Sequence, residues 1–232
     1  MERMHNTNLD QRENTMGLQM RELTAIAMAG VLAAVAAVSV AHGANAKVIY
    51  QAELSPLNSK ASGSDASGAA TFTLSGDRLT IHISAKGVPP NMEHLQHFHG
   101  FAAGHRRSRC PTTRDDKNHD GIIDMVETEP VAGTTMVPFT DDPVSMQIVN
   151  DTYPRAGPDG SYLYEKTISL KALKAAFTAK FPGQQLDLDR RVVFLHGVAT
   201  TTNLPATVVS LDHIPAQVTL PIACGEIRRV AG

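Results

Sequence analysis

Apolar residues recur at every second position in several short segments of this chain, and that period constrains the fold more than any other feature. In 47–54 the apolar side chains are Val48, Tyr50 and Ala52, the alternation of a strand with one buried face. Segments 69–74 and 79–84 flank Ser75-Gly76-Asp77, a hairpin signal. We expect further strands over 92–101, 145–149, 161–170, 191–196, 206–211 and 217–230. Short strands between Gly, Pro and Asn turns predict an all-β fold, an antiparallel sandwich or barrel.

One segment has a helical period instead. Lys171–Phe181 places Leu173, Phe177 and Phe181 on one face, which predicts one short helix covering the sheet. The composition excludes other classes of protein. A formal net charge of −2 over 232 residues gives no electrostatic footprint for nucleic acid or an anionic membrane. Two cysteines are too few for a disulfide-dense scaffold, and no Cys-x-x-Cys is present.

The N-terminal segment 1–46 has the pattern of a signal peptide. Arg21 precedes an uncharged apolar run over 24–41, and Ala44-Asn45-Ala46 forms a small-x-small cleavage site. The run approaches the roughly 20 residues that span a bilayer, so a membrane anchor is the alternative. Cleavage would leave one mature domain, 47–232, that is exported to the periplasm or secreted and has no membrane span. In that oxidising compartment Cys110 and Cys224 are expected to form a disulfide, the alternative being two free buried thiols.

The segment 92–100, MEHLQHFHG, concentrates the histidines. Because side chains at i and i+2 of a strand share a face, His97 and His99 point together, whereas His94 starts on the other face. Two imidazoles at this spacing suit a transition metal such as copper or zinc. The best candidate for a third ligand is His196, at the end of an apolar strand. The alternative is a hydrogen-bonded structural pair of histidines.

An acidic segment, 116–127, matches the calcium-loop pattern D-x-[DN]-x-[DN]-G-x₅-E at every defined position. Its expected ligands are the side chains or carbonyls of Asp116, Asn118, Asp120, Ile122, Asp124 and Glu127. Because Cys110-Pro111 and Pro130 flank the segment, we expect a calcium loop grafted between strands and not a helix–loop–helix domain. The alternative is an Asx-turn loop without an ion.

The order of these landmarks resembles that of copper/zinc superoxide dismutases. His97-x-His99-Gly100 looks like the family's paired copper ligands, and Val192–His196 looks like the late strand that supplies another copper ligand. Cys110 and the segment 220–227, LPIACGEI, look like the two ends of its internal disulfide. The stretches 50–54, 67–70 and 97–100 also resemble a chordin-type (CHRD) domain. The resemblance implies a Greek-key β-sandwich or flattened barrel.

The chain also departs from the dismutase pattern. His119 is the one histidine between Cys110 and His196, and it falls inside the calcium-like loop, so zinc is not expected and His119 is a doubtful metal-bridging ligand. Pro221 stands where the family has an arginine that guides superoxide. Positive charge would then come from another loop, the candidates being Arg106, Arg107 and Arg109.

Two classes of function follow. The first is a copper-only site, formed by His97, His99 and His196, with dismutase-like chemistry on a small anion such as superoxide; copper storage or delivery would use the same site. The second is a non-catalytic CHRD-type binding or structural module. Convergence of the three imidazoles on one point would favour the first, and a His196 that faces away would favour the second. The sequence identifies no protein partner.

Overall fold

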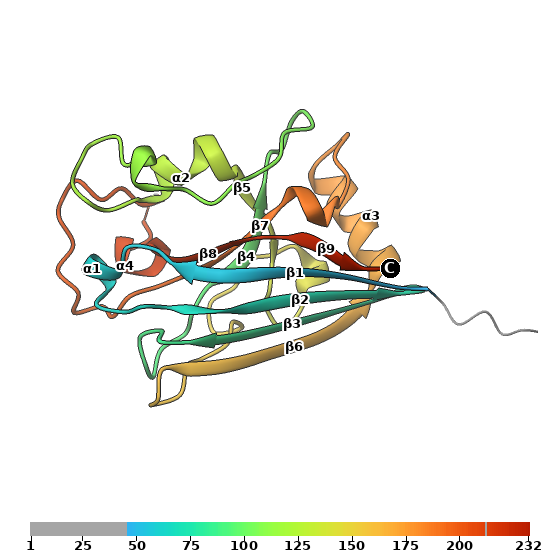
Figure 1. Ribbon diagram of the computed structural model, residues 1–232, viewed down its shortest axis with the longest axis horizontal. Helices are drawn as coiled ribbons and strands as arrows, with labels where there is room; N and C mark the ends of the chain where they lie inside the picture. The colour runs from blue at the N-terminus through green and yellow to red at the C-terminus, as the bar shows by residue number, and fades with distance from the viewer. Residues whose placement is uncertain (1–45, 212) are drawn as a thin grey trace, which may run out of the picture. The chain divides into compact units, whose positions relative to one another are not determined.

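The structure, a computed structural model, describes residues 46–211 and 213–232 (Figure 1). The expected signal peptide lies outside the described residues, except for its last residue. Within the described part of the chain, no helix has both the length and the apolar character needed to cross a membrane.

The described residues contain nine strands, and every strand pairing is antiparallel. The order across the sheet is β5-β4-β7-β8-β1-β2-β3-β6, and β9 adds to β1. The all-β prediction is therefore confirmed. The bounds are β1 Lys47–Pro56, β2 Ser67–Ser75, β3 Arg78–Lys86, β4 Gln96–Gly100, β5 Thr134–Pro138, β6 Ser161–Ser169, β7 Val192–His196, β8 Pro221–Glu226 and β9 Arg228–Ala231.

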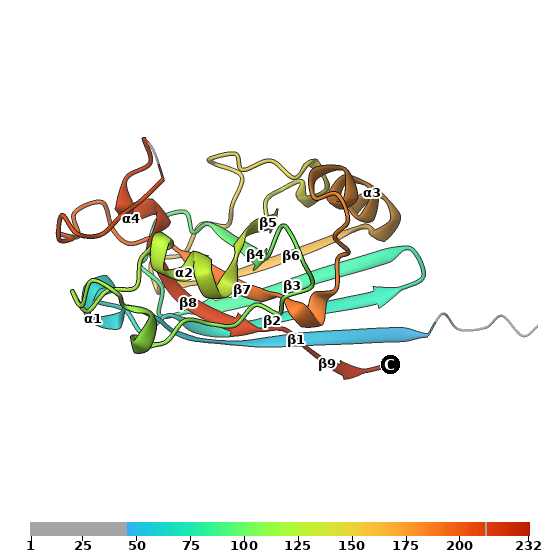
Figure 2. The ribbon, with the colours of Figure 1, turned by 90° about the horizontal axis from the view of Figure 1, so that it is seen from above.

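The sheet curls into a half-barrel, so that β4, β5, β7 and β8 lie over β1, β2, β3 and β6 (Figure 2). The segment after β5 links the two outer strands, β5 and β6. The Tyr164 hydroxyl on β6 donates to the Thr140 carbonyl over 2.8 Å, and Lys166 pairs with Asp141 at 3.2 Å. These contacts bring the segment that follows β5 against β6, so the two end strands of the curled sheet are linked by side chains and not by backbone pairing among the described residues.

The main core lies between the two halves of the curled sheet. Phe72 and Ile81, from β2 and β3, belong to the same buried cluster as Phe98 and Leu195, from β4 and β7. In β3 buried residues alternate with half-buried or exposed ones, as a strand with one core face requires. In β4 and β7 every residue is buried. The far face of these two strands must therefore be covered by the chain outside the sheet.

Four short helices lie among the described residues. They are α1 Ser59–Ser62, α2 Met125–Ala132, α3 Leu170–Lys180 and α4 Ala216–Thr219. The expected helix is α3, which buries Leu173 and Phe177. The sequence did not predict α1, α2 and α4. In α2 the start is set by Asp124, whose Oδ1 accepts hydrogen bonds from the amides of Val126 and Glu127.

Two expected strands are wrong, and one was missed. The segments 145–149 and 206–211 pair with no strand, and most of their apolar residues are exposed, namely Ile148, Val149, Val209 and Leu211, whereas Met146 is buried. Alternation alone does not make a strand where no neighbour completes the backbone hydrogen bonds. The missed strand, β5, is only five residues long and ends in Pro138, so it gave little pattern to detect.

The disulfide is present. Cys110 and Cys224 are bonded across 114 residues with a Cα–Cα distance of 5.8 Å, which excludes two free thiols. The bond joins the long segment between β4 and β5 to β8. A structural disulfide of this kind points to an oxidising, extracellular-type environment.

Candidate metal centre

The three candidate histidines come from two adjacent strands. In the β4–β7 register His97 lies opposite Phe194, so His99 and His196, each two residues further along its own strand, share that face. Phe194 and Cys224 belong to a small second cluster, separate from the main core. The histidines therefore lie on the outer face of the half-barrel, beneath the loops that cover it.

A β-bulge accompanies two of the three ligand candidates. The β4–β5 register shifts between Phe98 and His99, and the β7–β8 register shifts between Leu195 and His196. A bulge twists a strand locally and re-aims the side chain beside it. In both ladders the extra residue lies on the partner strand, Met136 on β5 and Ile222 on β8, so these partner strands bend beside His99 and His196.

The three imidazoles do converge. One ring nitrogen from each of His97, His99 and His196 lies within 4.8 Å of the others, and all three residues are buried. His97 Nδ1 and His99 Nε2 are 3.1 Å apart, which is hydrogen-bond distance. His196 therefore does not face away, and the residues brought together are the three that the sequence selected.

Backbone carbonyls orient two of the rings. Nδ1 of His99 donates to the Gly133 carbonyl over 2.9 Å, and Nδ1 of His196 donates to the Thr219 carbonyl over 2.7 Å. Because a carbonyl can only accept, both rings carry their proton on Nδ1 and keep a lone pair on Nε2. Nε2 of His196 is buried without any hydrogen-bond partner. Hydrogen bonds from Nδ1 to a carbonyl, as in His99 and His196, are typical of histidines whose Nε2 ligates a metal.

Burial keeps these imidazoles neutral. It lowers the pKa of His99 to about 3 and that of His196 to about 4, and it places the pKa of His97 well below its ordinary value. For His97 and His99 the nearby imidazoles lower the pKa further, since two charged rings repel. Neutral imidazole is the form that binds metal ions.

A cavity of about 360 Å³ connects the site to the surface. His99 lines it together with Thr135, whose Oγ1 lies 3.3 Å from His99 Nε2 and 3.5 Å from His97 Nε2. Much of the wall is apolar, and Lys180 and Glu129 supply the charged side chains. The lining residues are His99, Met125, Val126, Thr128, Glu129, Gly133, Thr134, Thr135, Ile148, Lys180, Phe181, Ser210 and Leu211.

The arginines expected to guide an anion do not line this cavity. Arg107 pairs with Asp189 at 3.7 Å, and Arg109 makes a two-point ion pair with Asp115 at 2.8 Å. Arg106 lies over the ring of Phe101. The cation on the cavity wall is Lys180, which the sequence offered no reason to select.

His119 is not part of the histidine cluster. It is exposed on the acidic segment with φ 60°, and the group of three converging ligands in the described residues does not include it. His94 lies on the opposite face, as expected, with its ring nitrogens 3.0 Å from the His196 carbonyl and 2.8 Å from the Pro89 carbonyl. It supports the backbone of β7 and faces away from the cluster.

The acidic segment forms a compact loop of side-chain-to-amide hydrogen bonds. Asp116 Oδ2 accepts from the Gly121 amide at 2.9 Å, and Asp120 Oδ1 accepts from the Ile122 amide at 2.8 Å. Glu127 Oε1 reaches back to the Lys117 amide at 2.6 Å. The Asp116 Oδ1 atom is buried and has no partner. The loop leads directly into α2, a helix that the sequence did not predict because Pro130 lies within it.

The acidic loop also contacts residues near Thr219, whose carbonyl orients His196. Asp120 Oδ2 accepts from the Thr207 hydroxyl at 2.6 Å, and Asp124 Oδ2 accepts from the Val209 amide at 2.7 Å. Ser210, next to Val209, shares a hydrogen bond of 2.8 Å between its hydroxyl and that of Thr219, and α2 ends beside Gly133. The acidic loop thus holds both segments that orient His99 and His196.

The landmarks that suggested a family resemblance lie close together in this fold. The strand with His97 and His99 pairs with the strand of His196, which pairs with the strand of Cys224. At the end of that ladder His196 pairs with Pro221, so a buried proline occupies the position where the resemblance expects an arginine. Neither a protein-family model nor a curated protein matches this chain.

Proposed function

We propose that this is an exported metal-binding protein whose His97–His99–His196 site takes copper. The observation that carries the proposal is the buried, unpartnered Nε2 of His196, which faces two other imidazole nitrogens. A buried polar atom without a hydrogen-bond partner lowers the stability of the fold by about 1–3 kcal/mol. A purely structural role of the histidines does not explain why the fold would keep this cost. This cost argues against the non-catalytic CHRD-type module.

The donor set fits copper. Imidazole–metal bonds are about 2.0–2.1 Å long, so nitrogens on one ion are at most about 4.2 Å apart. The observed set, within 4.8 Å, has to close only slightly. Three neutral imidazoles without thiolate or carboxylate suit copper, which also stands highest in the affinity order of divalent metals. Binding through His97 Nδ1 would move its proton to Nε2, 3.5 Å from the Thr135 hydroxyl that can accept it.

The function we favour for such a site is dismutase-like. Copper that changes oxidation state would supply one-electron chemistry to a small anion such as superoxide. The chain supplies the rest: buried rings held by the Gly133 and Thr219 carbonyls, a cavity reaching His99, and Lys180 on its wall to attract an anion. Copper storage or delivery would use the same ligands without turnover.

Elemental analysis and a superoxide assay test this function. We expect one copper per chain, and we expect His196→Ala to weaken copper binding at least 100-fold, because two ligands remain of three. His105→Ala, at an exposed histidine outside the cluster, is the control and should bind copper normally. Absence of copper uptake would overturn the proposal. Copper uptake without faster superoxide decay would favour storage or delivery.

We propose a second, structural role for calcium at the acidic loop. The supporting observation is Asp116 Oδ1, which is buried without a partner at the first ligand position of the motif. Carboxylate, amide and carbonyl oxygens around Gly121, whose φ is 83°, are the donors that calcium prefers. A bound ion would stiffen the segments that end at Gly133 and Thr219.

Thermal unfolding with and without calcium tests this role. At calcium concentrations about 100 times Kd we expect roughly 2.7 kcal/mol of added stability and a Tm higher by about 5–10 °C. Asp116→Asn should remove most of the gain. Asp159→Asn, which alters another turn carboxylate bonded to a nearby amide, should keep it. An equal Tm in calcium and in chelator would contradict the calcium role.

A further inference from the structure

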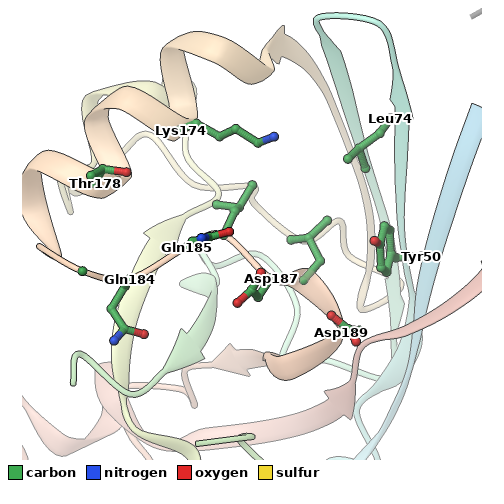
Figure 3. Close-up of a pocket in the computed structure, with 11 residues that line it drawn as sticks. Tyr50, Leu74, Lys174, Thr178, Gln184, Gln185, Asp187 and Asp189 are labelled. Carbon is green, nitrogen blue, oxygen red and sulfur yellow. The ribbon is translucent and has the colours of Figure 1, made fainter. Parts of the chain in front are cut away.

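A second and larger cavity, of about 590 Å³, lies away from the histidines (Figure 3). Side chains enter it from three places: Lys174 and Thr178 from α3, Tyr50 and Leu74 from β1 and β2, and the segment 183–189. None of the three clustered histidines lines it. Its volume falls within the roughly 300–1,000 Å³ typical of small-molecule sites.

Five polar side chains on its wall have no hydrogen bond or ion pair to another described residue. They are the side chains of Tyr50, Lys174, Thr178, Gln185 and Asp187, which come from all three walls. Figure 3 shows Lys174 extending toward the side of Tyr50 and Leu74, with Gln185 and Asp187 below the Lys174 side chain in this view. The cavity is therefore surrounded by hydrogen-bond donors and acceptors that are free to bind a ligand.

The backbone that presents these groups is held in place. Asp187 has a left-handed conformation, φ 32° and ψ 62°, between the buried Leu186 and Leu188. The buried Arg191 guanidinium donates to the Leu186 carbonyl at 3.2 Å and to the Gln185 carbonyl at 2.6 Å. A strained residue fixed by its surroundings often marks a functional site, and a rigid site loses little entropy on binding.

The charges of the cavity do not select an ion. Lys174 and Asp187 oppose each other in sign, and Asp189 is paired with Arg107. An anionic ligand would meet the two carboxylates, and a cationic ligand would meet the ammonium group. The apolar part of the wall consists of the Tyr50 ring and the side chains of Leu74, Leu186 and Leu188.

We propose that this cavity binds a neutral saccharide. Each sugar hydroxyl both donates and accepts, which matches a carboxylate, an amide, two hydroxyls and an ammonium group placed side by side. The C–H face of a sugar ring is apolar and suits an aromatic ring and leucine side chains. The proposal does not depend on the metal site, because the two sites share no residue.

The test is a titration followed by two-dimensional NMR of backbone amides. The probes are five neutral trisaccharides (maltotriose, cellotriose, mannotriose, xylotriose and chitotriose), with a trigalacturonate and a tripeptide as charged and peptide comparisons. We expect at least one neutral trisaccharide to shift the amides of 183–189 and Tyr50 selectively. Asp187→Asn should weaken that binding about tenfold, because a charge-assisted hydrogen bond becomes a neutral one.

Asparagine tolerates the left-handed backbone of Asp187, so Asp187→Asn should fold, and an unchanged Tm verifies this. Asp151→Asn is the matched control: Asp151 is also left-handed, with φ 61°, and exposed, and it lies outside the cavity. Binding by Asp151→Asn should equal that of the parent. No shift with any neutral trisaccharide at 20 mM, equal effects of the two variants, or tighter binding of trigalacturonate or the tripeptide would each overturn the proposal.

Discussion

Replacing both Cys110 and Cys224 by serine is expected to lower the free energy of unfolding by about 4–5 kcal/mol. The disulfide closes a loop of 114 residues, and in the chain-entropy model a loop of this size restricts the unfolded chain by that amount. Cys224 is buried on β8 opposite Phe194. Chemical denaturation of the parent and of the double variant, in metal-free buffer at pH 7.5, measures the difference.

The same variant should also bind copper less tightly. Cys110 lies in the segment that leads through the acidic loop and α2 to Gly133, whose carbonyl orients His99. Ser108→Ala is the matched control, because the Ser108 hydroxyl joins this same segment to the Ala132 carbonyl over 2.8 Å. Its loss should cost only about 1 kcal/mol. Equal denaturation midpoints for the double variant and the parent would show that the covalent link does not hold this segment.

Strand alternation predicts most of the sheet because it reports burial on one face. It succeeds for β1, β2 and β3, where one face meets the core and the other meets solvent. It fails for 145–149 and 206–211, whose exposed residues Ile148 and Leu211 line the cavity that reaches His99. The same apolar residue types line cavities and fill cores, so the sequence pattern alone does not distinguish these two environments.

The sequence predicted the three histidines of the metal centre, but it did not predict the groups that orient their rings or line the cavity beside them. The i, i+2 spacing places His97 and His99 on one face, and the apolar strand before His196 marks it as a neighbour in the sheet. The groups that orient the rings are the Gly133 and Thr219 carbonyls, and any residue type has a carbonyl. Lys180 reaches the cavity only because α3 ends there. Such contacts depend on tertiary structure that no spacing encodes.

Acidification of the metal-free protein from pH 7 to 5 is expected to remove about 2 kcal/mol of stability for each of His99 and His196, and His97 adds to the loss in the same direction. In the unfolded chain a histidine takes up a proton near pH 6.5. In the folded chain burial lowers the pKa of His196 to about 4 and of His99 to about 3, and it lowers the pKa of His97 strongly. Between these values the unfolded state binds more protons, so stability falls as the pH falls.

Denaturant unfolding in chelator at pH 7, 6 and 5 measures this loss. The window is favourable because the lowered pKa values of Asp77, Asp120 and Asp159 affect stability only below about pH 4, where those carboxyls gain protons. His196→Asn should remove the contribution of one ring, less than one third of the slope because burial also lowers the pKa of His94. The exposed His105→Asn should leave the slope unchanged. An unfolding free energy that is equal at pH 7 and pH 5 would mean that the cluster is not held neutral. In that case the buried rings would share protons in the folded state, and a metal would have to displace them to bind.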